Sequence, residues 1–357
     1  MLREDVERIL KKDIPDLAGK EIWIWGAGNT AQLYYEGLKR IENEDFTIAG
    51  YIDNNPLKIG KEFCGKQVIS AQQMEKKKKI CVLICTIRLE TIQEISRQLE
   101  KLQIEWHLID EVILKMHATE VLKCYDVIED DISKKIYAEL IKWRTTGKKP
   151  KIELRTGNPY FCMDRFSIAD PEEVFVDCGA YIGDTISEYI KQKSGVFKKI
   201  IAFEPDEANY VKLQKTVEQE EKKWRLEKNK IEVYPYGIAE KNSKIKFVHY
   251  EANEGLGSKF SEAVSEGESG KIVSLDKFVK EPYTFLKADI ESYEYKMLQG
   301  AREGIKKYKP LLAICIYHNA VDMYTIPLLV KKILPEYKIA IRHHLDDLSE
   351  TVMYAWI

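Results

Sequence analysis

The fold is decided by the stretch Val174-Phe-Val-Asp177-Cys-Gly179-Ala-Tyr181-Ile-Gly183-Asp184-Thr185, which has the pattern of an apolar strand, a glycine turn and a helix start. Glycines in such a turn allow positive φ and let a ligand approach the backbone closely. In open α/β sheets the turn lies at the carboxyl end of a strand, where ligands bind in a crevice. We therefore expect a doubly wound parallel sheet around this stretch, with a small ligand at its turn.

Acidic residues around the turn indicate what kind of ligand this is. The next predicted strand, residues 199–203, ends in Glu204-Pro205-Asp206, and a carboxylate there can accept hydrogen bonds from a ribose diol. Asp177 and Asp184 flank the turn with negative charge, which disfavours a pyrophosphate and favours the cationic ammonium and sulfonium of S-adenosylmethionine. The structural alternative is that Asp177 only supports the turn and Asp184 only caps the helix.

The rest of the C-terminal half continues the alternation of strands and helices. Further strands are predicted at residues 231–236, 285–290 and 311–317, followed by a helix at about 321–334. Two closing strands, 337–342 and 351–356, flank a polar turn and should pair antiparallel. The expected architecture of residues 156–357 is thus a doubly wound α/β sheet with antiparallel closing strands.

Five motifs carry a resemblance to a known family. They are Val176-Asp177-Cys-Gly179-Ala-Tyr-Ile-Gly183-Asp184, Phe203-Glu204-Pro205-Asp206, Leu275-Asp276, Phe285-Leu-Lys287-Ala-Asp289-Ile-Glu291-Ser292-Tyr-Glu294 and Leu298-Gln-Gly300-Ala301. In this order they resemble the FkbM-type methyltransferases, from about residue 160 to the C-terminus. The resemblance implies a class I methyltransferase fold for residues 156–357. It also implies an S-adenosylmethionine-dependent O-methyltransferase that acts on a hydroxyl of a small, sugar-like or secondary-metabolite acceptor.

The resemblance also implies which residues bind the cofactor. Asp177, Gly179 and Gly183 would line its methionine end, Glu204 would hold the ribose, and the adenine would lie near Asp206, Gly237 and Ile238. The complete expected set is Asp177, Gly179, Tyr181, Gly183, Asp184, Thr185, Glu204, Pro205, Asp206, Gly237 and Ile238. The chain departs from the family where Ser292 replaces a common glycine, which predicts an acceptor pocket of different shape.

Candidate catalytic residues follow the two strands predicted at 285–290 and 311–317. Lys287, Asp289 and Glu291 would share one strand face by the period of two. The alternative is a buried ion pair between Lys287 and a carboxylate, with a structural role. His318 follows the strand at 311–317, at the carboxyl edge. Histidine as a residue type is suited to general-base chemistry near neutral pH, although a lone histidine is more often structural. No ligand spacing indicates a metal, so none is expected.

The N-terminal third predicts a second, smaller domain. Strands at residues 21–25, 46–52, 80–85 and 105–109 indicate a Rossmann-like parallel sheet over residues 1–125, with a helical linker at 126–155. The turn Gly26-Ala-Gly28-Asn29 and the later Asp53 form a loose dinucleotide pattern. The stretch around Asp53 also resembles small nucleotide-sugar-associated domains. NAD(P) binding, a nucleotide-sugar docking role and a structural role therefore stay open for this domain.

Composition limits the other possibilities. A formal charge of −2 among 357 residues offers no field for nucleic acid, and no apolar run reaches the roughly 20 residues of a membrane span. Seven cysteines without Cys-x-x-Cys spacing, and an N-terminus unlike a secretion signal, predict a cytoplasmic protein with reduced thiols. The alternative functions are an NAD-dependent sugar-modifying oxidoreductase and a non-catalytic S-adenosylmethionine sensor. The oligomeric state stays open, with a homo-oligomer among the alternatives.

Overall fold

The computed structural model describes residues 3–42, 46–74, 79–86, 88–151, 153–248, 259–261 and 268–357. The chain forms two compact units. The first contains residues 1–126, 134–153 and 318–324, and the second contains residues 127–133, 154–317 and 325–357. The two units are therefore interleaved in sequence.

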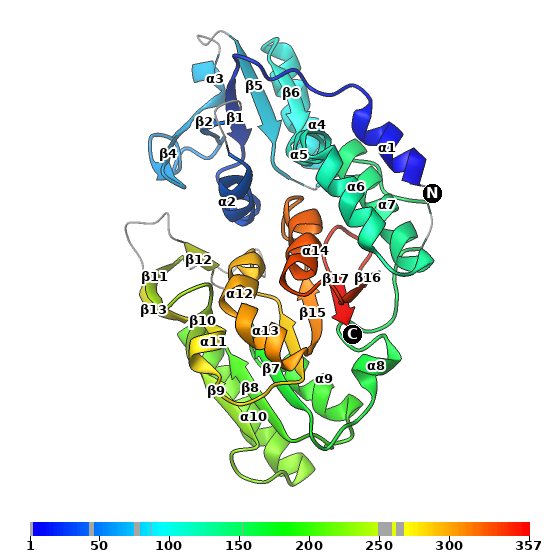
Figure 1. The fold of residues 1–357 in the computed structure, drawn as a ribbon. Helices are drawn as coiled ribbons and strands as arrows, with labels where there is room; N and C mark the ends of the chain where they lie inside the picture. Colours follow the sequence, from blue (N-terminus) through cyan, green and yellow to red (C-terminus); the bar gives the residue numbers. More distant parts are fainter. Residues whose placement is uncertain are drawn as a thin grey trace. The chain divides into compact units, whose positions relative to one another are not determined.

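The first unit contains a six-stranded sheet in the order β3-β4-β2-β1-β5-β6 (Figure 1). All neighbouring strands are parallel except β3 and β4. The strands are β1 (Glu21–Trp25), β2 (Ile48–Ile52), β3 (Glu62–Phe63), β4 (Lys66–Ile69), β5 (Ile80–Ile84) and β6 (Glu105–Leu108). The helices are α1 (Arg3–Lys11), α2 (Asn29–Ile41), α3 (Ala71–Met74), α4 (Leu89–Lys101), α5 (Ile109–Met116), α6 (Ala118–Val127) and α7 (Asp131–Thr146).

The second unit contains a seven-stranded sheet in the order β16-β17-β15-β14-β7-β8-β9. These strands are β7 (Val174–Cys178), β8 (Lys199–Phe203), β9 (Ile231–Tyr234), β14 (Phe285–Ala288), β15 (Leu311–Cys315), β16 (Lys338–His343) and β17 (Thr351–Trp356). A smaller sheet has the order β10-β13-β11-β12, with β10 (Tyr236–Ile238), β11 (Ser243–Val248), β12 (Lys259–Ser261) and β13 (Glu268–Val273). The helices are α8 (Asp164–Ser167), α9 (Asp184–Gln192), α10 (Glu207–Trp224), α11 (Leu275–Phe278), α12 (Glu294–Gly300), α13 (Arg302–Tyr308) and α14 (Asp322–Ile333).

The strand order of the larger sheet predicts where a ligand crevice lies. From β7 the chain proceeds outward through β8 and β9, and then returns to the other side of β7 with β14 and β15. The direction of winding thus changes between β7 and β14, and ligands of doubly wound sheets bind beyond the carboxyl ends of strands at such a switch point. The five strands β9, β8, β7, β14 and β15 are parallel, while β17 and β16 pair antiparallel. The predicted fold class is confirmed.

The core beside the larger sheet is rich in aromatic rings. Phe175 of β7 stacks on Tyr189 of α9 with ring centroids 4.3 Å apart, and Phe285 of β14 lies edge-on to Phe166. Each buried aromatic ring removes a large apolar area from water, and such pairs add about 0.5–1.5 kcal/mol beyond that burial. The core therefore fixes β7, β14 and α9, the elements that flank the crevice.

The segment predicted as a helical linker at residues 126–155 does not form one continuous helix. Helix α6 ends at Val127 and α7 begins at Asp131, and between them Ile128 forms a parallel bridge with Ile339. The Asp130 carboxylate accepts a hydrogen bond from the Ser133 backbone N–H, so it caps the first turn of α7.

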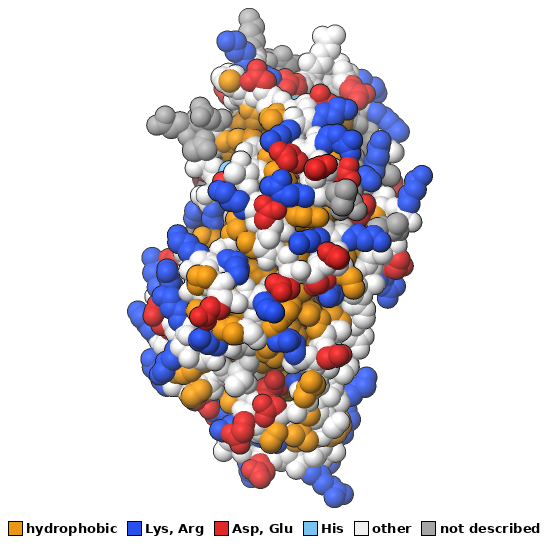
Figure 2. All heavy atoms as spheres, turned by 45° about the vertical axis from the view of Figure 1, so that its right-hand side comes forward, with side chains coloured by type: hydrophobic (Ala, Val, Ile, Leu, Met, Phe, Trp, Pro, Cys, Tyr) orange, Lys and Arg blue, Asp and Glu red, His pale blue; other side chains and the backbone are white. Residues whose placement is uncertain are grey.

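Three features of the described residues concern membrane spans, disulfides and surface charge. None of the helices described combines the length and apolarity that a bilayer crossing requires. All seven cysteines are free thiols. Basic and acidic side chains are interspersed over the face drawn in Figure 2.

Candidate cofactor site

The turn between β7 and α9 is built on left-handed backbone. Gly179 and Gly183 have φ of +85° and +90°, and Tyr181 between them has φ of +50°. A Cβ at Gly179 would lie only 1.9 Å from the Asp289 carbonyl oxygen, so no other residue fits there. The N–H groups of Gly179 and Ala180 both donate to the Phe203 carbonyl at 3.0 Å. The turn is therefore held between the ends of β8 and β14, at the switch point.

Glu204 lies at the end of β8 and faces this turn. One carboxylate oxygen accepts the Tyr181 N–H at 2.9 Å and the other accepts the Asp206 N–H at 2.9 Å. The residue is only 7% exposed, and this burial raises the pKa of Glu204 to about 7 although both N–H groups oppose the shift. Each oxygen keeps a lone pair that could accept a hydroxyl, so the carboxylate can still hold a diol.

Other residues predicted to bind the cofactor have structural partners or lie in secondary structure. Asp206 is the N-cap of α10, and its carboxylate accepts the Asn209 N–H at 2.8 Å. Asp184 and Thr185 begin α9 after Gly183. Gly237 and Ile238 are buried in β10, which pairs with β13. Pro205 separates Glu204 from the cap of α10. The role of all these residues toward a cofactor remains a prediction.

A buried ion pair joins β7 to β14. The Lys287 Nζ lies 2.9 Å from an Asp177 carboxylate oxygen and also donates to the Gly179 carbonyl at 2.8 Å. Burial opposes the charge of the ammonium, but the neighbouring carboxylates of Asp177 and Asp289 together raise the pKa of Lys287, so it stays protonated. The second carboxylate oxygen of Asp177 has no hydrogen-bond partner among the described residues, which leaves an acceptor for a cationic ligand.

Asp289 is held by two tyrosines. Its carboxylate oxygens accept hydrogen bonds from the hydroxyl of Tyr160 at 3.1 Å and from that of Tyr317 at 3.2 Å. Burial and the charge of Asp289 raise the pKa of both tyrosines, which are therefore neutral donors. Neither tyrosine was among the residues predicted from the sequence. Tyr317 ends a predicted strand and could have been found from that position, whereas Tyr160 lies in a loop that carries no such signal.

The loop after β14 contains two consecutive strained residues. Strand β14 ends at Ala288, and Glu291 and Ser292 then have φ of +56° and +76°. The strand alternation on which we grouped Glu291 with Lys287 and Asp289 therefore does not extend to Glu291. Ser292 has left-handed backbone, which glycine adopts without steric cost. This explains why the FkbM-type family commonly has glycine at this position.

We expect Ser292→Gly to raise the free energy of unfolding by about 0.5–1 kcal/mol. A left-handed conformation costs a non-glycine residue about 1–2 kcal/mol, and the greater unfolded-state freedom of glycine cancels part of that gain. Denaturant unfolding measures the change. The matched control is Ser187→Gly inside α9, where the same substitution should destabilise, because glycine is a poor helix former. A lower free energy of unfolding in Ser292→Gly would contradict the inference that the left-handed backbone at Ser292 costs stability.

Two of the family-like motifs have structural partners. Asp276 of α11 accepts the N–H groups of Glu303 and Gly304 at 2.9 and 2.8 Å, so it caps the start of α13. At Gly300 a Cβ would lie 2.0 Å from the Ala239 carbonyl oxygen. The Leu275-Asp276 and Leu298–Ala301 motifs therefore fix the packing of α11, α12 and α13.

Three described histidines follow or lie in strands β15 and β16. His343 contacts the Thr351 hydroxyl at 2.8 Å and His344 contacts the Tyr354 hydroxyl at 3.1 Å, within the closing strands. Burial lowers the pKa of His344. His318 is buried and begins the segment His318–Tyr324, which belongs to the first unit. Its role as a base remains a prediction.

The glycine turn of the first unit lies between β1 and α2. Gly26 has φ of +114°, and Asn29 is the first residue of α2 after the N-cap Gly28. One carboxylate oxygen of Asp53 accepts the Ala27 N–H at 3.0 Å and lies 3.2 Å from the Lys58 ammonium. Asp53 thus fastens this turn, and its ligand remains a prediction.

Two family models match the chain. Residues 177–337 match one described as "Methyltransferase FkbM domain", and residues 19–109 match one described as "C2185-like, N-terminal". None of the curated proteins compared matches the sequence. The first model covers the glycine turn, Glu204, the Lys287–Asp177 pair and Asp289.

Solved structures resemble the chain over different lengths. The crystal structure of methyltransferase FkbM from Methylobacillus flagellatus KT covers 99% of this chain with 98% of its own, at 18% identity and a TM-score of 0.59. An rRNA methylase from Streptococcus thermophilus covers 52% of the chain with 87% of its own, at 17% identity and a TM-score of 0.32. A putative methyltransferase from Streptococcus mutans in complex with SAH covers 53% with 91% of its own, at 15% identity and 0.33. The first likeness shows a shared fold over both units.

Proposed function

We propose that the protein transfers the methyl group of S-adenosylmethionine to a hydroxyl of a small, sugar-like acceptor, because residues 177–337 match the family model of the FkbM methyltransferase domain. The family match supports a methyl-transfer role. We further propose that the cofactor is S-adenosylmethionine, that the acceptor atom is oxygen and that the acceptor is sugar-like. The observation that carries the cofactor is Glu204, a buried carboxylate with free lone pairs beside the turn at the switch point.

The charges of the site support a cationic cofactor. Among the described residues, one carboxylate oxygen of Asp177 near the turn has no partner, so an ammonium could donate to it. Glu204 offers acceptors for the ribose diol. Bound S-adenosylmethionine would supply a methyl group activated by its sulfonium. Lys287 would hold the Gly179 carbonyl and so keep the turn in position.

The remaining task of the protein is to position the acceptor and take its proton. When the acceptor hydroxyl is methylated, its proton would have to leave for a base. We propose His318 for this role. The hydroxyls of Tyr160 and Tyr317 already donate to the two carboxylate oxygens of Asp289, so this residue would position groups beside the crevice.

Calorimetry of the full chain tests the cofactor. S-adenosylmethionine and S-adenosylhomocysteine should bind with one site per chain, and NAD serves as the comparison for the oxidoreductase alternative. Transfer of labelled methyl from S-adenosylmethionine to cell metabolites then tests the reaction. Binding of the cofactor without any transfer would favour the sensor alternative, and heat with NAD alone would reject the proposal.

We expect the affinity for S-adenosylmethionine to rise roughly tenfold between pH 6 and pH 8. Burial raises the pKa of Glu204 to about 7, so at lower pH its carboxyl is protonated and one acceptor oxygen becomes a donor. Deprotonation through pH 7 restores the form that accepts the diol. Calorimetry across this range measures the effect, and Glu204→Gln should give a flat profile. An equally steep profile in Glu204→Gln would assign the titration to another group.

We expect His318→Ala to reduce methyl transfer by at least about 100-fold while cofactor affinity stays unchanged, because general-base catalysis contributes about 10²–10⁴-fold. The matched control is His117→Ala, whose ring stacks on Tyr324 in the first unit. Turnover and cofactor binding are measured in parallel. Normal turnover of His318→Ala would remove this histidine from the mechanism.

A further inference from the structure

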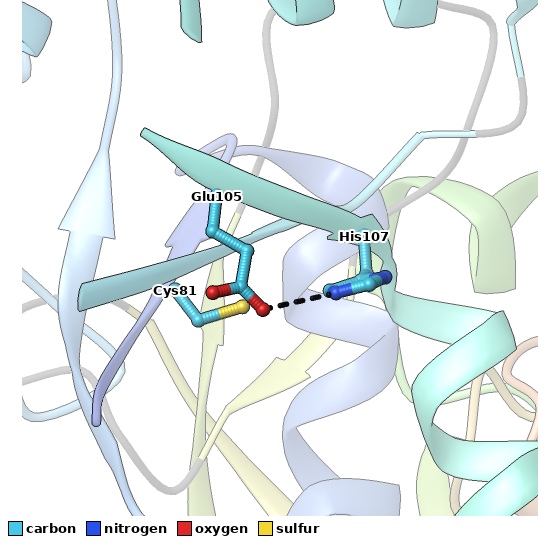
Figure 3. A group of neighbouring side chains, drawn as sticks. All are labelled: Cys81, Glu105 and His107. Carbon is cyan, nitrogen blue, oxygen red and sulfur yellow. Dashed lines mark hydrogen bonds and ion pairs between the residues drawn. The ribbon is translucent and has the colours of Figure 1, made fainter. Parts of the chain in front are cut away.

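We propose that Cys81, Glu105 and His107 form a binding site for a divalent zinc-type cation in the first unit. Cys81 pairs in register with Glu105 on neighbouring parallel strands β5 and β6, and His107 lies two residues further along β6. Alternate residues of a strand share a face, so the three side chains project from the same face of the sheet. Figure 3 shows them pointing toward one another. One ligand atom from each, Sγ, a carboxylate oxygen and a ring nitrogen, lies within 4.8 Å of the others.

The histidine is oriented as a metal ligand would be. Its Nε2 lies 3.3 Å from a Glu105 oxygen, inside the cluster. Its Nδ1 lies 3.7 Å from a carboxylate oxygen of Glu111, which is itself paired with Lys115 at 2.7 Å. Metal-binding histidines usually direct their second ring nitrogen at a carboxylate, which fixes the tautomer. Glu111 would thus hold the proton on Nδ1 and leave the Nε2 lone pair for the metal.

The glutamate keeps one oxygen for the cluster. One carboxylate oxygen of Glu105 lies 2.6 Å from the Lys20 ammonium, and the other faces His107. Lys20 therefore orients the carboxylate without occupying the oxygen that a metal needs. With a thiolate, a carboxylate, a divalent cation and the Lys20 ammonium, the site would carry one net positive charge.

The cysteine completes a donor set that is selective for particular metals. Cys81 is fully buried, and burial raises the pKa of its thiol to about 12, so a metal would displace the thiol proton to water as the sulfur–metal bond forms. Glu105 and His107 are 41% and 24% exposed in their side chains, which gives the ion a route from solvent. Sulfur, imidazole nitrogen and carboxylate oxygen together suit Zn²⁺ or Co²⁺ and not Ca²⁺ or Mg²⁺. Three protein ligands leave a fourth position open for water.

Local spacing rules do not reveal this site, because its ligands lie on two strands separated by α4. No metal was expected from the sequence for that reason. Register between β5 and β6 brings Cys81 beside Glu105.

Titration of the chelator-treated full chain with Co²⁺ tests the site. We expect one Co²⁺ per chain, with thiolate-to-metal charge-transfer absorption and the visible bands of tetrahedral cobalt. Cys81→Ala should abolish the charge-transfer band, and His107→Ala should weaken Zn²⁺ binding in a competition assay by at least about tenfold. The matched control is Cys85→Ala, a second buried cysteine of the same unit, which should bind as the unchanged chain does.

Two further variants keep the test decisive. Glu111→Gln should weaken Zn²⁺ by about tenfold, because it removes the carboxylate that faces Nδ1. If circular dichroism shows that Cys81→Ala does not fold, His107→Gln replaces it, since this side chain is partly exposed. Absence of the charge-transfer band in the unchanged chain overturns the proposal, as does Zn²⁺ affinity that neither histidine variant changes.

Discussion

Replacing Lys287 by methionine is expected to lower the free energy of unfolding by about 3–5 kcal/mol, because the change leaves the buried Asp177 without its cation. The lysine also donates to the Gly179 carbonyl, so the glycine turn loses a support at the same time. Urea unfolding measures the loss as a lower transition midpoint. A change smaller than 1 kcal/mol would mean that the pair is not buried as described.

The double variant Asp177→Leu with Lys287→Met should recover most of this loss, since apolar side chains of similar volume often replace a buried ion pair without cost. The matched control is Lys193→Met, which breaks a second buried pair with Glu173 at the end of α9. Both single variants should be destabilised. Only the Lys287 variant should also lose affinity for S-adenosylmethionine in its folded fraction, because only Lys287 holds the turn.

Glu204→Ala is expected to weaken binding of S-adenosylmethionine by about 100-fold or more. Two hydrogen bonds from a diol to a charged carboxylate contribute about 1.5–3 kcal/mol each, and every 1.4 kcal/mol is a factor of ten in affinity. The substitution also frees the N–H groups of Tyr181 and Asp206. Calorimetry at pH 8, where the carboxyl is ionised, gives the largest difference from the unchanged chain.

Two further variants distinguish the binding of the diol by Glu204 from its hydrogen bonds to the glycine turn. Glu204→Gln keeps the size and one acceptor oxygen, so it should bind more tightly than Glu204→Ala and still more weakly than the unchanged chain. Glu207→Ala, at the exposed first position of α10, removes a carboxylate three residues away and should leave the affinity intact. Unaltered affinity in Glu204→Ala would refute the cofactor site that we propose.

Much of the fold followed from the sequence because its strands are buried and apolar. The predicted bounds of β8 and β17 coincide with the structure, and the glycine turn after β7 lies where the pattern indicated. Short elements were missed. Strands β3 and β4 hold only two and four residues, and Val68 is the one fully buried residue among them, so no apolar periodicity marks them.

The site was harder to predict where it depends on residues far apart in the chain. A buried pair between Lys287 and a carboxylate was one of two interpretations that the sequence left open. The partner, Asp177, was not identified, since a strand pattern places both residues at a sheet edge without giving their register. Tyr160 reaches Asp289 from a loop 129 positions earlier. Such a contact depends on how the loop is fixed, here by its N–H bond to the Tyr354 hydroxyl at 2.8 Å, and no local pattern encodes it.

The interleaving of the two units limits how the protein can be divided. The chain passes from one unit to the other after residues 126, 133, 153, 317 and 324. Its late segment supplies Asn319, which donates to the Leu33 carbonyl, and Asp322, which pairs with Arg40. A fragment that stops near residue 153 would retain the whole six-stranded sheet and still lack these partners of α2. Recombining N-terminal and C-terminal halves from different relatives at one junction would therefore mismatch helix α2 with a segment inherited from the other parent.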